Sequence, residues 1–219
     1  MLGDPKKARY SRVGPLKKLR GAVLSTHLQL LRWAGAKSWL VPRILSDSST
    51  NNRYIEPFLG SGAALLNMHS HMPSFGGDEN EELILTLRSV RDEPSEVLQH
   101  LATFANTRDH YQQIRAQDRK NNFLEMSNPA RAARFIYLNH TCFNGLHRVN
   151  SRGEFNVPFG NRTLNPEELE ARVKSVARTL QAKLEVAGVE NLLRTDFMTL
   201  LKAVVPGDFV YLDPPYFQG

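Results

Sequence analysis

Residues 209–216 read Phe-Val-Tyr-Leu-Asp-Pro-Pro-Tyr, an apolar run that leads into an acidic turn with two prolines. The apolar run predicts a short strand, which would place Asp213 at its carboxyl end, where open α/β sheets carry their chemistry. Pro214 and Pro215 have a fixed φ and no N–H, so the turn is stiff and its carbonyls remain available as acceptors. Such a turn can accept hydrogen bonds from an amino group, while Tyr216 offers a flat face to a ring. A plain turn after a strand explains the same residues, because Asp and Pro both favour turns.

A glycine loop follows a second predicted strand earlier in the chain. Residues 53–58 predict the strand, residues 59–62 read Leu-Gly-Ser-Gly, and a helix is expected from residue 63 to about residue 71. Strand, glycine loop and helix form an arrangement that holds a polar ligand at a helix N-terminus. The loop lacks the third glycine of the dinucleotide motif and the Lys-Ser/Thr of a P-loop. A nucleotide-like ligand without a pyrophosphate therefore fits this loop better.

Two further acidic positions follow predicted strands. Asp78, in Gly-Asp-Glu-Asn, is placed to accept hydrogen bonds from ribose hydroxyls. Asp196 and Phe197 follow strand material predicted at residues 184–193, and they pair an acceptor with a ring, which suits the amino group and the face of adenine. Each acid could instead be a helix N-cap, with Phe197 in the core.

The middle of the chain predicts helices at residues 81–122, 128–139 and 166–183, interrupted by a segment of different character at residues 140–162. Asn144-Gly145 and Arg152-Gly153 are turn signals that predict a hairpin there. Arg, Asn and His side chains alternate with aromatic rings in this segment. Arg and Asn can read base edges and an aromatic ring can wedge into a base stack. A surface hairpin without a ligand is the alternative.

The net charge of +6 over 219 residues is concentrated at the N-terminus. Residues 1–20 hold seven basic residues and one acidic residue, and the remaining chain balances 21 basic against 21 acidic residues. Such a tail could bind phosphates or be a solvated terminus. The one cysteine, Cys142, excludes an internal disulfide and a cysteine zinc cluster, and it fits a reducing cytosol. No membrane span or signal peptide is visible. Residues 16–33 predict an amphipathic helix, followed by Trp33-Ala34-Gly35-Ala36-Lys37.

Taken in order, these motifs resemble the Dam-type (class alpha) DNA adenine-N6 methyltransferases, from about Leu31 to Tyr216 and most specifically over residues 143–160. The resemblance implies an α/β fold with a Rossmann-like S-adenosylmethionine-dependent methyltransferase sheet and an inserted, mainly helical DNA-recognition domain carrying a β-hairpin. It implies a basic tail at residues 1–20, a catalytic domain at 21–80 and 181–219, and a target-recognition domain at 81–180. The family continues past the Asp-Pro-Pro-Tyr motif, so the C-terminal part of the catalytic domain is expected to be missing.

The resemblance also implies roles for individual residues. Asp213, Pro214, Pro215 and Tyr216 form the catalytic motif, in which Asp213 and the Pro214 carbonyl would accept from the N6 amino group of the target adenine and Tyr216 would stack on that base. The residues that match S-adenosylmethionine contacts of the family, its cofactor loop or the pair beside the cofactor's adenine are Trp33, Lys37, Glu56, Phe58, Gly60, Gly62, Asp78, Asp196, Phe197 and Asp213.

The implied DNA contacts lie in residues 143–158. Phe143 would intercalate, Asn144 would contact the orphaned partner base and Arg148 would bond a guanine edge. The residues expected to touch the thymine side or to belong to the same base-reading segment are Leu146, Pro158 and Arg152.

The function implied is methyl transfer to adenine N6 in duplex DNA, in GATC, after base flipping. The expected location is the cytoplasm, at the nucleoid, for a protein of bacterial or phage origin. The expected biological role is left open between restriction–modification, a phage function and housekeeping. Two alternatives remain open: an inactive DNA- or cofactor-binding remnant, and an N-methyltransferase acting on RNA or protein. For a DNA methyltransferase, a second polypeptide that supplies the missing C-terminal portion is an expected partner.

Overall fold

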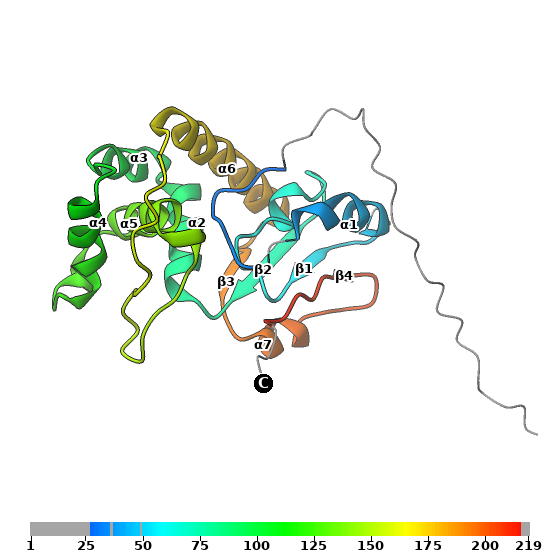
Figure 1. The fold of residues 1–219 in the computed structure, drawn as a ribbon. Helices are drawn as coiled ribbons and strands as arrows, with labels where there is room; N and C mark the ends of the chain where they lie inside the picture. The colour runs from blue at the N-terminus through cyan, green and yellow to red at the C-terminus, as the bar shows by residue number, and fades with distance from the viewer. Residues whose placement is uncertain (1–26, 36, 49, 216–219) are drawn as a thin grey trace, which may run out of the picture.

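The structure is a computed structural model that describes residues 27–35, 37–48 and 50–215 (Figure 1). Within them, a four-stranded sheet has the order β3-β2-β1-β4. Every neighbouring pair in this sheet is parallel, with Tyr54 opposite Ser74, Gly76 opposite Leu192 and Tyr54 opposite Phe209. The strands are β1 (Tyr54–Glu56), β2 (Ser74–Asp78), β3 (Leu192–Arg194) and β4 (Phe209–Val210). Because the strands are parallel, their carboxyl ends share one edge, where loops 57–64, 78–80 and 211–215 meet.

Helices form the second part of the molecule (Figure 1). The α-helices of the described residues are α1 (Val41–Ser48), α2 (Glu81–Asp92), α3 (Pro94–Ala102), α4 (Arg108–Arg115), α5 (Asn128–Thr141), α6 (Pro166–Ala187) and α7 (Phe197–Lys202). Helices α2, α3 and α5 pack against one another, and α6 reaches from this group to β2. None of the helices in the described part of the chain is both long and apolar enough to cross a bilayer.

Helix ends follow the local chemistry of the sequence. Pro94 opens α3 and Pro166 opens α6, positions where the missing N–H of proline costs no helical hydrogen bond. The side chain of Asn165 caps α6 by accepting from the N–H groups of Glu167 and Glu168. The cap of α5 is Ser127, whose hydroxyl accepts from Ala130 N, and not Asn128 as the sequence suggests.

One apolar core extends from the sheet into the helical part. Tyr54 of β1, Leu83 of α2, Ile136 of α5 and Val176 of α6 are all buried members of the same cluster. Burial of this continuous apolar surface is the main force that holds the helices against the sheet. Buried residues on both sides of the predicted domain boundaries at residues 80 and 180 therefore belong to one core.

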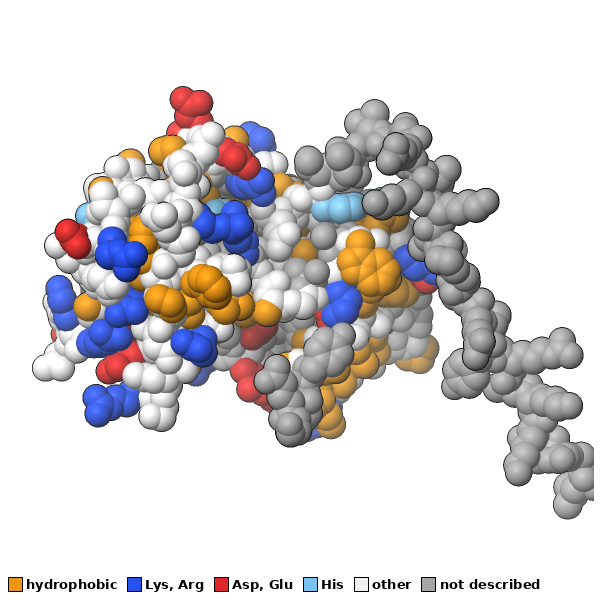
Figure 2. Space-filling model, in the orientation of Figure 1, with side chains coloured by type: hydrophobic (Ala, Val, Ile, Leu, Met, Phe, Trp, Pro, Cys, Tyr) orange, Lys and Arg blue, Asp and Glu red, His pale blue; other side chains and the backbone are white. Residues whose placement is uncertain are grey.

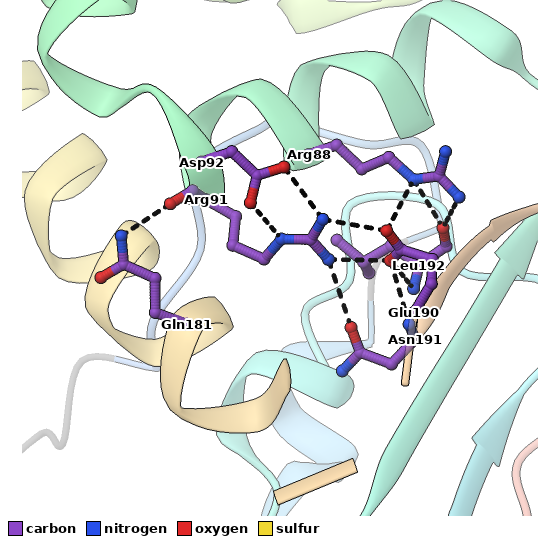
Figure 3. Close-up of polar contacts among 7 residues, drawn as sticks. All are labelled: Arg88, Arg91, Asp92, Gln181, Glu190, Asn191 and Leu192. Carbon is purple, nitrogen blue, oxygen red and sulfur yellow. Dashed lines mark hydrogen bonds and ion pairs between the residues drawn. The ribbon is translucent and has the colours of Figure 1, made fainter. Parts of the chain in front are cut away.

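A polar network fastens α2 and α6 to the start of β3 (Figure 3). The guanidinium of Arg91, which is only 3% exposed, donates to both oxygens of Glu190 and to Asp92. Gln181 of α6 donates to the backbone carbonyl of Arg91, and Asn191 donates to the carbonyl of Ser74. Burial would raise the pKa of Glu190, but the hydrogen bonds from Arg91 lower this pKa to about 2. The network thereby fixes where β3 begins beside β2.

Three predicted elements differ in the structure. The helix expected at residues 63–71 is a single 3-10 turn, η2 (Leu65–Asn67), in which the side-chain amide of Asn67 donates to Ala63 O, the acceptor that Asn67 N would use in an α-helix. The strand material expected from residue 184 is still α6, which ends at Ala187 before Gly188 at φ +68°, and β3 begins only at Leu192. Of the helix expected at residues 16–33, residues 16–26 lie outside the described part, and residues 27–33 are not helical.

The non-helical conformation of residues 27–33 has a tertiary cause. Leu28 N donates to the side chain of Asn67, and Arg32 N donates to the side chain of Asn139. These long-range bonds use backbone groups that a helix would need, so tertiary contacts override the apolar periodicity.

The segment at residues 140–162 doubles back on itself as predicted but forms no continuous ladder. Two isolated antiparallel bridges join Cys142 with Phe159 and Val149 with Phe155. The backbone bonds of the second bridge run from Asn150 N to Glu154 O and from Asn156 N to Arg148 O. Phe155 N is not one of their donors, and the side chain of Asp118 accepts from it at 2.7 Å. A carboxylate from outside the segment thus holds its returning limb.

Candidate active site and base-reading segment

A cavity of about 450 Å³ lies at the carboxyl edge of the sheet. Its walls come from residues 33–35 and Lys37, the loop after β1, the end of β2, the start of α7 and the turn after β4. The predicted site residues among its lining are Trp33, Lys37, Glu56, Phe58, Gly60, Asp78, Phe197, Asp213 and Pro215. Motifs that are far apart in the sequence therefore meet in one place, because the parallel strands bring their carboxyl ends together.

Asp213 is held by a lysine at the mouth of the cavity. The ammonium of Lys37 lies 2.5 Å and 2.8 Å from the two carboxylate oxygens of Asp213, and both side chains are partly buried. The same ammonium donates to Gly35 O at 3.2 Å. Gly35 and Lys37 are thus fastened to the Asp-Pro-Pro turn.

The glycine loop is shaped by Asp78 and by Trp33. One carboxylate oxygen of Asp78 accepts from Gly60 N and the other from Asn80 N, each at 2.9 Å. Gly60 has a φ of +51°, and a Cβ at this position would lie 2.7 Å from Cδ1 of Trp33. Asp78 does not cap α2, since Asn80 does so by accepting from Leu83 N. Asp78 instead closes the loop from the end of the neighbouring strand.

Glu56 is a buried carboxyl beneath the loop. It accepts from the hydroxyl of Tyr54 and from Leu65 N, each at 3.0 Å, and is 4% exposed. Burial raises the pKa of Glu56 to about 8; the two hydrogen bonds lower it, and the negative charges of Asp213 and Asp78 raise it. Glu56 is therefore mainly protonated at pH 7 and acts as a neutral hydrogen-bonding group in the floor of the cavity.

Two rings form an aromatic wall. Phe58 and Phe197 are stacked with centroids 5.0 Å apart and an angle of 26° between their planes. Phe197 is 38% exposed rather than buried in the core, so the core alternative for this residue is wrong. The alternative prediction for Asp196, a helix N-cap, is confirmed. Its carboxylate caps α7 by accepting hydrogen bonds from the backbone N–H and the hydroxyl of Thr199. Among the cavity's lining residues, Phe197 is present and Asp196 is not.

Besides Asp196, two predicted residues of the described part do not line the cavity. Gly62 is buried and shapes the loop with a φ of +66°, accepting from Leu66 N. Pro214 is exposed and is not part of the lining, although Pro215 beside it is. Tyr216 lies outside the described residues.

Residues 143–160, predicted to read bases and therefore called the base-reading segment below, lie along the helical part of the molecule. The residues predicted to touch DNA are all exposed, as a contact surface requires: Phe143, Asn144, Leu146, Arg148, Arg152 and Pro158. Phe143 is 51% exposed, which is unusual for a large ring without a partner surface. In Figure 2, Lys and Arg side chains surround hydrophobic side chains over this part of the molecule.

Sequence reasoning missed three residues that position this segment. Asp118 pairs with Arg134 at 2.7 Å and accepts from Phe155 N. Asn139 and His147 join the segment to residues 30–33, near Trp33. Burial lowers the pKa of His147 below its ordinary value, which keeps the ring neutral at pH 7. The sequence carries no local signal for this packing, because the neighbours of His147 are Leu146 and Arg148.

Comparison with known proteins identifies the family. A family model described as D12 class N6 adenine-specific DNA methyltransferase matches residues 33–218. A type II methyltransferase of Lactococcus lactis subsp. cremoris is 34% identical over 188 residues, covering 84% of this chain and 64% of the relative. A type II methyltransferase of Methanocaldococcus jannaschii is 32% identical over 206 residues, covering 85% of this chain and 68% of the relative.

A third relative is the DNA adenine methylase of Escherichia coli K12, which is 32% identical over 193 residues, covering 85% of this chain and 64% of the relative. The chain thus spans about two thirds of the length of these relatives. The resemblance to adenine-N6 methyltransferases expected from the motifs is confirmed. The chain belongs to the family of D12 class N6 adenine-specific DNA methyltransferases.

Proposed function

We propose that this chain binds S-adenosylmethionine in the cavity and methylates N6 of adenine in duplex DNA, within GATC. The observation that carries the proposal is the meeting of Asp213, Asp78 and Trp33 around one cavity beside exposed rings. In this proposal the sheet is the Rossmann-like methyltransferase sheet, and the helices α2–α5 with the base-reading segment are the inserted recognition domain. The names of the relatives favour DNA over RNA or protein as the substrate class.

The residues of the cavity fit an adenosyl cofactor. A flat adenine needs an aromatic wall, which Phe58 and Phe197 supply. Ribose hydroxyls need acceptors, and the carboxylate of Asp78 lines the cavity at the end of β2. Pyrophosphate would need more open N–H groups at a helix start than this loop has, because only the 3-10 turn η2 follows it. When bound, the cofactor supplies an electrophilic methyl group on a sulfonium.

The protein's own contribution to the reaction is to orient and polarise the attacking nitrogen. The N6 amino group is a weak nucleophile that gains positive charge as it attacks. The carboxylate of Asp213 and the carbonyl of Pro214 would accept from its two hydrogens and favour that charge. Lys37 fixes the orientation of the Asp213 carboxylate through two hydrogen bonds. The prolines hold the acceptors in place at no further entropic cost.

Access to the turn requires that the target adenine leave the duplex. In this proposal, exposed residues of the base-reading segment would take over the contacts that the flipped base gives up. Phe143 would fill the gap in the stack, Asn144 would contact the unpaired base, and Arg148 would bond a guanine edge. Leu146 and Pro158 would meet the thymine side, with Arg152 on the adjoining turn.

The deciding assay supplies methyl-labelled S-adenosylmethionine and duplexes that differ only in one GATC site. Label on adenine N6 in the GATC duplex alone is the expected result. Label on RNA or protein in a competition arm, or label independent of GATC, would refute the substrate proposed. A parallel arm adds a polypeptide that corresponds to the remaining third of the Lactococcus relative. Label only in that arm would assign the reaction to a two-part enzyme, and cofactor binding without label in either arm would identify an inactive remnant.

A further inference from the structure

The indole of Trp33 contacts both the cofactor cavity and the base-reading segment. It lines the cavity, and the loop approaches it so closely that a Cβ on Gly60 would lie 2.7 Å from the indole. The imidazole of His147 stacks on the same indole, with centroids 5.5 Å apart and planes 19° apart. His147 belongs to the base-reading segment, so a ring of the cavity wall, Trp33, is in contact with a ring of this segment.

His147 is itself held from two further directions. Its ring lies 5.1 Å from that of Phe135 in α5 and 5.9 Å from that of Phe155, in the returning limb of the segment. Phe155 is buried, and its N–H is bonded to Asp118. The position of His147 therefore reports on both limbs of the base-reading segment.

The side chain of Asn139 makes a second connection between the same two segments. The buried carboxamide of Asn139 accepts from Arg32 N at 2.8 Å and donates to Arg32 O at 2.7 Å. It also donates to Gly145 O at 3.2 Å. Gly145 packs so closely on Arg32 that a Cβ there would lie 2.7 Å from the Cβ of Arg32. The chain just before Trp33 and the start of the base-reading segment are thus joined through one amide.

We propose that His147 is a positioning residue that couples occupancy of the cofactor cavity to the affinity of the base-reading segment for DNA, through its stack on Trp33. The inference rests on the function proposed above. A ligand that holds the Trp33 indole in one place also holds the ring stacked on it, and through that ring both limbs of the segment. Coupling between two binding sites is reciprocal, so DNA must increase cofactor affinity by the same factor.

The test measures dissociation constants for a GATC duplex with and without saturating S-adenosylhomocysteine, and for S-adenosylhomocysteine with and without the duplex. The expected ratio for the unmodified chain is roughly 5-fold to 150-fold, the usual range for allosteric coupling. His147→Ala should reduce this ratio severalfold, with the remainder carried by the Asn139 contacts, and His147→Phe, which keeps a ring, should restore most of it. If His147 had only a structural role, His147→Ala would lower thermal stability and leave the ratio of dissociation constants unchanged.

The matched control is His71→Ala. His71 is an exposed histidine that also stacks on a ring, that of His69, at 5.5 Å and 24°, but it precedes β2 at the opposite edge of the sheet from the cavity. The ratio of dissociation constants for His71→Ala should equal that of the unmodified chain. A spectroscopic readout uses Trp39→Phe, which removes the highly exposed second tryptophan. In that background, adding DNA should change Trp33 emission, and His147→Ala should abolish the change.

Failure of the inference differs from failure of the proposed function. If the unmodified chain binds both ligands with a ratio near 1, or if His147→Ala keeps the full ratio, the coupling role is wrong while the proposed function stands. The same conclusion follows if His147→Phe matches the unmodified chain in stability yet loses the coupling as His147→Ala does. If the unmodified chain binds neither S-adenosylhomocysteine nor DNA, the proposed function is wrong and the inference is wrong with it.

Discussion

Lys37 and Asp213 are separated by 176 positions in the sequence, yet the lysine ammonium bonds both carboxylate oxygens of the aspartate. A second bidentate pair, between Arg53 and Asp208, lies at the other end of β4. The two pairs bracket the same short strand. Only the Asp213 pair lines the cavity.

This contrast predicts opposite phenotypes for the two aspartates. Asp213→Ala should lower kcat roughly 100-fold or more, since an acceptor aimed at developing charge is lost. Its thermal stability should hardly change, because the pair is partly exposed and such pairs contribute little. Asp208→Ala should show the reverse, with near-normal kcat and a lower unfolding free energy. Single-turnover methylation and thermal melts of both variants check this, and a normal rate for Asp213→Ala would exclude the proposed mechanism.

The close approach of Gly60 to Trp33 predicts a specific loss of cofactor affinity. Gly60→Ala adds a methyl group 2.7 Å from the indole, at a residue with φ +51°. Gly188→Ala is the matched control, because Gly188 has a φ of +68° but no atom within 4 Å of an added Cβ. Both variants should lose about 1–2 kcal/mol of stability from the left-handed backbone.

Only Gly60→Ala should also weaken S-adenosylhomocysteine binding, by roughly tenfold or more, which corresponds to about 1.4 kcal/mol. Isothermal titration calorimetry on both variants separates the two effects. Equal affinities in the two variants would show that the Trp33 contact does not shape the site.

The buried carboxyl of Glu56 predicts a pH dependence of stability. Its pKa rises from 4.5 to about 8 on folding, so between these values the unfolded chain releases a proton that the folded chain keeps. The unfolding free energy contributed by this group is fully present below pH 4.5 and is lost as pH rises towards 8. His140 and His147, whose pKa values burial lowers, change stability in the opposite direction below pH 6.5.

Glu56→Gln isolates the contribution of this carboxyl, since glutamine keeps an acceptor for Tyr54 and Leu65 but does not titrate. Urea unfolding at pH 5 and pH 8 should show a larger drop in unfolding free energy for the unmodified chain than for Glu56→Gln. The same drop in both proteins would mean that Glu56 is ionised in the folded state at neutral pH.

Arg148 should control sequence discrimination more than overall affinity. Its exposed guanidinium donates through Nε to Asn156 across the segment, which leaves the terminal nitrogens to face a base edge. Arg148→Ala is expected to reduce discrimination at one G·C pair by roughly 1–3 kcal/mol. Lys174→Ala on the exposed face of α6 is the control, because Lys174 is an exposed cation that pairs with Glu170 of its own helix. Competition binding with single-substitution duplexes gives the comparison, and uniform weakening on all duplexes would assign Arg148 to phosphate contact instead.

Local signals in the sequence predicted the strands that surround the cavity and several helix ends. The apolar runs before Glu56 and Asp213 became β1 and β4, and Asn165 with Pro166 began α6. These features depend on residues near one another in the chain. For the same reason, the acids and rings that follow strands could be placed together before the structure was known.

Long-range contacts account for what the sequence did not predict. Residues 27–33 have helical periodicity, but their backbone bonds to Asn67 and Asn139 override it. The helix expected after the glycine loop shortens to η2, where the side-chain amide of Asn67 donates to the carbonyls of Ala63 and of the distant Leu28. His147 carries no motif of its own, and its stack on Trp33 depends on two segments that only the folded chain brings together.

The strand order β3-β2-β1-β4 has a consequence for synthesis on the ribosome. Helices α2 to α5 are neighbours in the sequence and can pack as soon as they emerge, since local contacts form fastest. Strands β1 and β2 emerge earlier, yet β2 must wait for Leu192 and β1 for Phe209 before their open sides are paired. During that interval a nascent chain holds a finished helical region beside two unpaired strand edges, which makes it a target for chaperones before it can bind any cofactor.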